Sequence, residues 1–108
     1  MYKNIVRLVI TTGMTLSSIS AQAYINSAEA LLLTNKCAKC HSVDKQKDGP
    51  SYKSTALKYK DTKDADKKLY THLTTGPKVK IDGIEEEHVK IKGEDAAIKD
   101  VVKYILSR

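Results

Sequence analysis

The segment KCAKCH, residues 36–41, constrains this chain more than any other part of it. It contains both cysteines of the sequence, Cys37 and Cys40, and His41 directly follows the second. Three interpretations compete. A disulfide would close a very small loop, and a thioredoxin-like redox pair needs a βαβ setting, whereas no alternating apolar strands flank this segment. The third is covalent attachment of a c-type haem, for which Cys-x-x-Cys-His is the signature.

The haem interpretation gives each residue of the motif a role. The two thiols would add to the haem vinyl groups, and His41 would be the proximal iron ligand. The spacing presents both sulfurs along one porphyrin edge and brings the imidazole beneath the iron. The sequence also lacks Phe and Trp. A domain this small is marginally stable without a disulfide, metal or cofactor, so a buried porphyrin would supply missing apolar bulk.

The N-terminal residues have the order of a secretory signal peptide. MYKNIVR carries two positive charges, the following residues 8–20 are uncharged and largely apolar, and AQA ends the segment at Ala23. This pattern predicts cleavage after Ala23, an exported domain over residues 24–108, and a periplasmic location. An uncleaved anchor is the alternative, but the apolar stretch is short for a spanning helix, which needs about 20 residues. We therefore expect no stable membrane anchor after cleavage.

Cleavage would change the composition in two ways. Of the 108 residues, 85 would remain, and the loss of Lys3 and Arg7 from 19 basic residues against 13 acidic ones leaves a net charge of about +4. Met1 and Met14 are also lost, so the exported protein contains no methionine. A charge excess this modest in an exported protein does not indicate a nucleic-acid partner.

Hydrophobic periodicity predicts helices over residues 25–36, 51–60, 64–76 and 94–108. Asn26 is expected to cap the first helix, with Glu29 at the capping-box position. Asp64 is expected to begin the third helix and Gly76 to end it. Residues 77–93 show neither a sustained helical stripe nor a clean strand pattern, and we expect an extended loop there. The predicted fold class is all-α.

The order of these features resembles a small bacterial class I cytochrome c of the c-551/c-552 type. It runs from a helix through CAKCH and GPSYK to a helix ending in TTG, a loop, and a final helix containing VVKYILS. The resemblance covers essentially all of residues 24–108. It implies helices wrapped around one covalently bound haem c, and a role as an electron carrier rather than an enzyme.

The resemblance also assigns structural contacts. The Pro50 carbonyl would accept a hydrogen bond from the His41 imidazole, as outer partners of metal ligands commonly do. Leu32 would pack against Val101 and Tyr104 where the first and last helices cross. Tyr104 stands where many relatives have tryptophan.

One residue of the family pattern has no counterpart. Relatives supply the second axial ligand from a methionine in a Pro-Met-Pro-like loop before the last helix, but residues 24–108 contain no methionine. The family spacing, counted back from Tyr104, falls on His88. A neutral imidazole suits iron. The three glutamates that precede His88 are typical of a solvated loop and count against its burial.

Several other occupants of the sixth coordination position stay open. They are His72, a lysine such as Lys80 or Lys90, a tyrosine oxygen, and water or a small ligand at an open site. The helical phase places His72 on the surface or edge of its helix. Lysine must lose a proton before it can bind iron.

Ligation by His41 and His88 would give a low-potential carrier, because methionine–histidine ligation raises the potential of a haem. Around the attachment motif lie four lysines: Lys36, Lys39, Lys45 and Lys47. They would steer acidic redox proteins towards the haem edge, or they are ordinary solvated lysines. Two alternative functions are a haem protein with an open sixth site for small ligands, and a haem subunit of a larger oxidoreductase.

Overall fold

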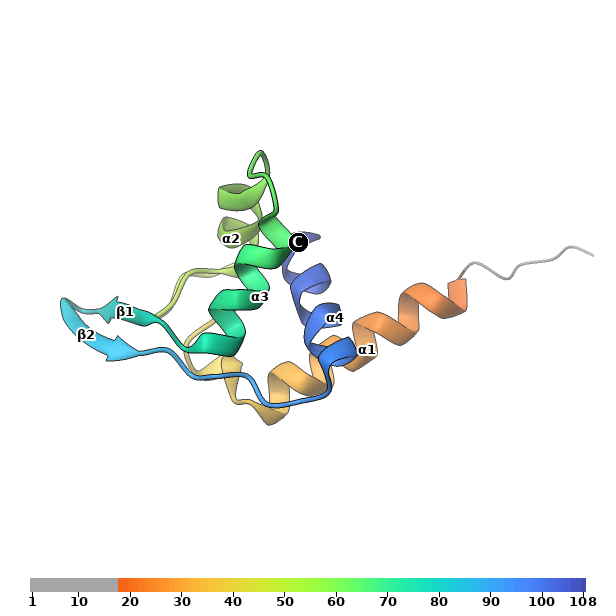
Figure 1. Cartoon of the computed structure of the whole chain (residues 1–108), viewed down its shortest axis with the longest axis horizontal. Coiled ribbons are helices and arrows are strands. Elements are labelled where there is room, and N and C mark those ends of the chain that lie inside the picture. Colours follow the sequence, from red (N-terminus) through yellow and green to blue (C-terminus); the bar gives the residue numbers. More distant parts are fainter. Residues whose placement is uncertain (1–17) are drawn as a thin grey trace, which may run out of the picture.

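The computed structural model describes residues 18–108, which form four α-helices, one short 3-10 helix and a β-hairpin (Figure 1). In chain order the elements are α1 (Ser18–Thr34), η1 (Cys37–Lys39), α2 (Tyr52–Tyr59), α3 (Ala65–Thr75), β1 (Lys78–Ile81), β2 (Ile84–Glu87) and α4 (Asp95–Leu106). The predominantly helical fold expected from the sequence is present. The first 17 residues of the predicted signal peptide lie outside the described residues. No helix within residues 18–108 has both the length and the hydrophobicity to span a bilayer.

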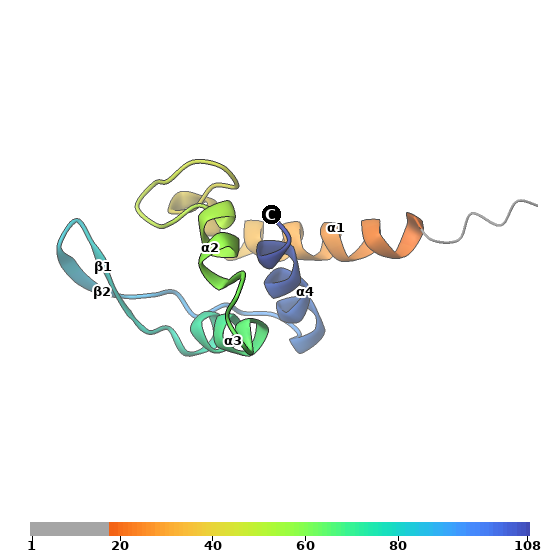
Figure 2. The ribbon, with the colours of Figure 1, turned by 90° about the horizontal axis from the view of Figure 1, so that it is seen from above.

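Helix α4 is the centre of the hydrophobic core. It packs against α1, α2 and α3 (Figure 2). Four of its buried side chains follow the i, i+3, i+4, i+7 spacing of one helix face, and Tyr104 is buried in addition. The five are Ile98, Val101, Val102, Tyr104 and Ile105. Leu32 of α1 is buried in the same core. The crossing of the first and last helices implied by the family resemblance is therefore present.

The helix ends agree only in part with the sequence analysis. Gly76 ends α3 with a left-handed φ of 60°, as predicted. Asp64 precedes α3, but its side chain makes no capping hydrogen bond. Asn26 lies inside α1 and accepts a hydrogen bond from Gln22, so the predicted cap and capping box are wrong. The residues before Asn26 continue the helix, which leaves no free helix end for Asn26 to cap.

Residues 77–93 are not the uninterrupted loop that we expected. β1 and β2 pair antiparallel, with Lys78 opposite Glu87 and Ile81 opposite Ile84. Asp82 and Gly83 connect the strands with φ values of 52° and 80°, as a two-residue type I′ turn requires. An Asp-Gly pair between alternating residues is a strong hairpin signal, because this turn matches the twist of the strands. The segment KVKIDGIEEE contains this signal, so the hairpin could have been predicted from the sequence.

Candidate functional site

The two cysteines and His41 lie on one tight turn at the end of α1. Lys36 has a left-handed φ of 57° and turns the chain from α1 into η1. The Cys37 carbonyl then accepts hydrogen bonds from the N–H groups of Cys40 at 3.2 Å and His41 at 3.0 Å. Both cysteines are half-buried and free of a disulfide. Burial raises the pKa of the Cys37 thiol. The turn thus presents two thiols and an imidazole together.

The His41 ring is held on several sides. Its Nδ1 donates to the Pro50 carbonyl at 2.7 Å, the hydrogen bond that the resemblance implied. The ring stacks on Tyr52 with centroids 5.8 Å apart and planes 22° apart. Gly49 lies so close that a Cβ there would overlap the imidazole. These contacts fix the orientation of the ring and leave Nε2 available.

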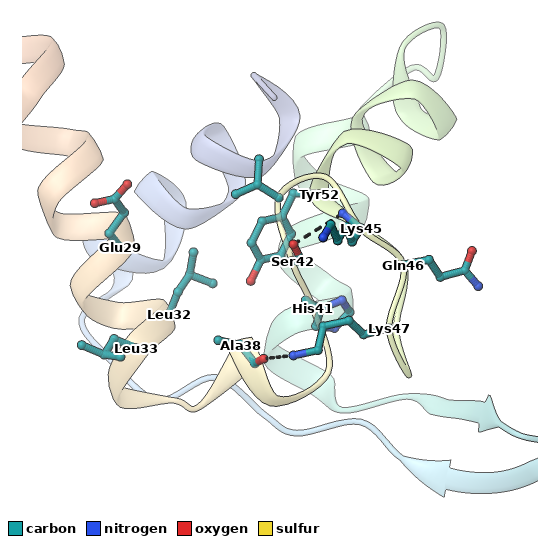
Figure 3. Close-up of a pocket in the computed structure, with 11 residues that line it drawn as sticks. Glu29, Leu32, Leu33, Ala38, His41, Ser42, Lys45, Gln46, Lys47 and Tyr52 are labelled. Carbon is teal, nitrogen blue, oxygen red and sulfur yellow. Dashed lines mark hydrogen bonds between the residues drawn. The ribbon is translucent and has the colours of Figure 1, made fainter.

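An open pocket of about 660 Å³ lies beside this turn, between α1, η1 and the loop of residues 41–50 (Figure 3). Its walls include aliphatic groups of Leu32, Leu33 and Val43 and the ring of Tyr52. Burial raises the pKa of Tyr52 to about 12, so its phenol stays neutral. Neither cysteine nor His88 lines this pocket, which supplies apolar surface on the α1 side of His41. The fit of the site for a covalently attached porphyrin therefore rests on the two thiols and the imidazole that the turn presents together.

The loop that borders the pocket is fastened to the cysteine turn. Lys47 Nζ donates to the Ala38 carbonyl at 2.6 Å (Figure 3). Lys36, Lys39 and Lys45 surround the same turn, and all four lysines are exposed. The attachment site therefore carries a positively charged rim.

His88 follows the last residue of β2 and lies opposite His41. The two ring centroids are 6.1 Å apart, with the ring planes at 49°. His88 Nδ1 donates to the Val89 carbonyl at 2.8 Å, as His41 Nδ1 does to Pro50. Two metal–nitrogen bonds of about 2 Å, with the distances from each nitrogen to its ring centre, also span about 6 Å. The separation of the two rings is therefore of the size that one iron between them would require.

His72 belongs to the same group of rings. It is half-buried, and its centroid lies 4.7 Å from that of His88 in an edge-to-face arrangement at 62°. Burial lowers the pKa of His72, and the charges of His88 and neighbouring groups lower it further. The helical phase identified an edge position, but no sequence signal indicated this contact. Lys80 and Lys90 are exposed, and Lys90 forms an ion pair with Glu87 at 3.8 Å.

The segment after His88 is tied to both neighbouring helices. Asn35, two residues before Cys37, donates from Nδ2 to the Lys92 carbonyl at 3.0 Å, and Asn35 Oδ1 accepts the Lys92 N–H at 2.9 Å. On the other side, the Ile91 N–H donates to the Leu73 carbonyl at 2.8 Å. Nothing in the local sequence of Asn35 indicates a partner so far along the chain, so this contact could not be predicted from the sequence.

Comparison with known proteins decides the family. The sequence matches the family model described as cytochrome c over residues 25–108. The chain belongs to the cytochrome c family. It binds one covalently attached haem c and exchanges electrons with redox partners, as an electron carrier rather than an enzyme.

Solved structures of class I cytochromes resemble this cytochrome c. The crystal structure of the class 1 cytochrome MtoD from Sideroxydans lithotrophicus ES-1 shares 51% sequence identity, with a TM-score of 0.75 over 77% of this chain and 94% of that one. Wild-type cytochrome c552 from Nitrosomonas europaea shares 29% identity, with a TM-score of 0.62 over 73% of this chain and 96% of that one. A search of curated proteins finds no significant match.

Proposed function

We propose that this cytochrome c is a periplasmic, low-potential electron carrier. Cys37 and Cys40 hold the haem through thioether bonds, and His41 and His88 are its axial ligands. The observation that carries the proposal is the pair of facing imidazoles, 6.1 Å apart, each with Nδ1 bonded to a backbone carbonyl. The predicted signal peptide supports the periplasmic location. When bound, the haem supplies a reversible one-electron change at iron.

The residues around the two histidines prepare them as ligands. A carbonyl that accepts a hydrogen bond from Nδ1 fixes the tautomer and ring orientation and raises the basicity of the other nitrogen. Pro50 does this for His41, and Val89 does it for His88. Two strong, neutral ligands can be kept in both oxidation states, which limits the rearrangement that accompanies each electron. Histidine in place of methionine lowers the reduction potential.

The lysine rim favours acidic redox proteins as partners. Lys36, Lys39 and Lys45 surround the attachment turn and are exposed. Opposite charge on a partner raises the rate of encounter, and salt screens the effect. We expect the second-order rate of electron exchange with an acidic redox protein to fall as ionic strength rises. A rate independent of salt would contradict this part of the proposal.

The axial ligands are tested by spectroscopy and potentiometry. The wild-type protein should be six-coordinate and low-spin in both oxidation states, and its ferrous form should bind carbon monoxide slowly. His88→Met should raise the reduction potential, whereas the matched control His72→Met should leave both spectrum and potential close to wild type. Rapid carbon monoxide binding by wild-type protein would support an open sixth site instead.

The location and the independence of the protein are tested separately. The mass of the protein recovered from the periplasm should correspond to a chain that begins at Tyr24 with one haem attached. Stable co-purification with a larger oxidoreductase would contradict a freely diffusing carrier and support the subunit alternative.

A further inference from the structure

The β-hairpin has two chemically different faces. Directly opposed residues in an antiparallel pair share a face, and successive residues alternate between faces. The register therefore places Lys78, Lys80, Glu85 and Glu87 on one face, named here the outer face. The other face, named here the inner face, carries Val79, Ile81, Ile84 and Glu86.

The inner face is the face that carries His88. The His88 N–H donates to the Pro77 carbonyl at 2.9 Å, which extends the strand pairing by one residue pair. His88 lies two residues after Glu86, so the two side chains share a side of the strand. Because the His88 ring approaches the His41 ring at 6.1 Å, the inner face is directed towards the haem iron of the proposed function.

Among residues 18–108, the apolar side chains of the inner face are not packed on the hydrophobic core. Val79 and Ile81 are half-buried, Ile84 is 64% exposed, and none belongs to the buried core. Figures 1 and 2 both show the hairpin projecting away from α1 and α4. A two-stranded hairpin is at best marginally stable unless its apolar face packs on something.

The two faces of the hairpin differ in their ion pairs. On the outer face, Lys78 and Glu85 form an ion pair at 3.1 Å. Glu87 pairs with Lys90 at 3.8 Å. Glu86, on the inner face, has no ion pair with any described residue.

We propose that the inner face of the hairpin lies over the distal side of the haem, with Val79 in contact with it and Glu86 lowering its reduction potential. The inference rests on the proposed ligation by His88. Along a strand, two residues span about 7 Å, so Val79 and Glu86 lie one row from His88 and the isoleucines about 13 Å away. A nearby carboxylate stabilises the oxidised haem, which carries one more positive charge.

Methyl NMR of the haem-loaded, reduced protein tests the contact with Val79. The porphyrin ring current shifts methyl signals upfield when they lie above its plane. The Val79 signals, identified by their loss in Val79→Ala, should be shifted upfield. The matched variant Lys80→Val places a valine on the outer face, and its methyl signals should stay near ordinary values. Unshifted Val79 signals would overturn the proposed position of the inner face.

Three consecutive substitutions test Glu86. Glu85→Gln, Glu86→Gln and Glu87→Gln remove the same charge, but only Glu86 lies on the inner face. Glu86→Gln should raise the reduction potential by more than either neighbour does. Equal shifts in the three variants, or a largest shift at an outer position, would overturn its role.

The failure of this inference can be told apart from failure of the proposed ligation. The wild-type spectrum and its reaction with carbon monoxide report whether His88 binds iron, whichever way the hairpin faces. A protein that is six-coordinate through His88 but shows unshifted Val79 methyls would refute the inner-face placement alone. A wild-type protein that binds carbon monoxide rapidly would refute the ligation on which the inference rests.

Discussion

Replacing Asn35 with alanine should loosen the segment that carries the distal histidine. The Asn35 side chain exchanges two hydrogen bonds with the Lys92 backbone, at 3.0 and 2.9 Å, and donates a third to the Leu31 carbonyl at 2.9 Å. The Leu31 carbonyl keeps other donors, including the Asn35 N–H at 3.1 Å. The expected loss of stability therefore comes mainly from the two hydrogen bonds that join the end of α1 to the segment after His88.

The magnitude follows from the environment of these bonds. A typical intramolecular hydrogen bond contributes about 1 kcal/mol net. Lys92 is exposed, so water can replace part of the hydrogen bonding that its backbone loses in the variant. We expect Asn35→Ala to reduce the free energy of unfolding by about 1–2 kcal/mol, and to lower Tm by roughly 4–8 °C for each kcal/mol. Asn35→Asp keeps the acceptor for the Lys92 N–H and should have an intermediate effect.

Denaturant titration of the haem-loaded protein, followed by circular dichroism, measures the change. Asn26→Ala is the matched control, because Asn26 is exposed on α1 and, among the described residues, its side chain bonds only to Gln22, which belongs to the predicted signal peptide. Its effect should lie within about 0.5 kcal/mol of zero. If Asn35→Ala is no more destabilising than Asn26→Ala, the two bonds to Lys92 do not hold the segment, and the reasoning is wrong.

Two further predictions concern a glycine and an ion pair. Gly76→Ala should destabilise the protein by more than 2 kcal/mol and speed carbon monoxide binding, since φ of 60° costs about 1–2 kcal/mol and the new Cβ would lie 2.6 Å from the His88 carbonyl oxygen. Gly83→Ala, with φ of 80° and open space around it, is the control and should show only the strain. Asp95, whose pKa the Lys99 hydrogen bond lowers from the ordinary 3.8, should stabilise the protein at neutral pH. In thermal unfolding, the Tm of wild type should exceed that of Asp95→Asn at neutral pH, and this difference in Tm should disappear as pH falls below that value, because protonation removes the charge. A difference in Tm that persists at the lowest pH would contradict this.

The sequence was most informative where neighbouring residues act together. Cys37, Cys40 and His41 are so close in sequence that a single turn of the chain brings them together. Their association therefore does not depend on the tertiary fold. The buried face of α4 could be predicted for the same reason, because helical spacing sets which side chains share a face. The hairpin is also encoded locally, by the turn residues Asp82 and Gly83, although we expected an extended loop there.

The expected helix caps show where local reasoning fails. A capping side chain at Asn26 is favourable only if the backbone leaves the helix there. The residues upstream are also compatible with a helix, so α1 begins at Ser18 and Asn26 becomes an interior residue. Asp64 does precede α3, but its φ of 57° directs the chain differently from an ordinary cap.

The sequence by itself determined the covalent attachment motif, the helical class and the absence of methionine from residues 24–108. It could rank His88 as an axial ligand only by analogy with relatives. The tertiary structure decided that His88 faces His41, that His72 packs against His88, and that the Asn35 side chain is hydrogen-bonded to the Lys92 backbone. These contacts join segments far apart in the chain, and they depend on the packing of α3 and α4 and on the register of the hairpin. A shift of one residue in that register would turn His88 to the opposite face, so no local pattern could specify the distal side of the site.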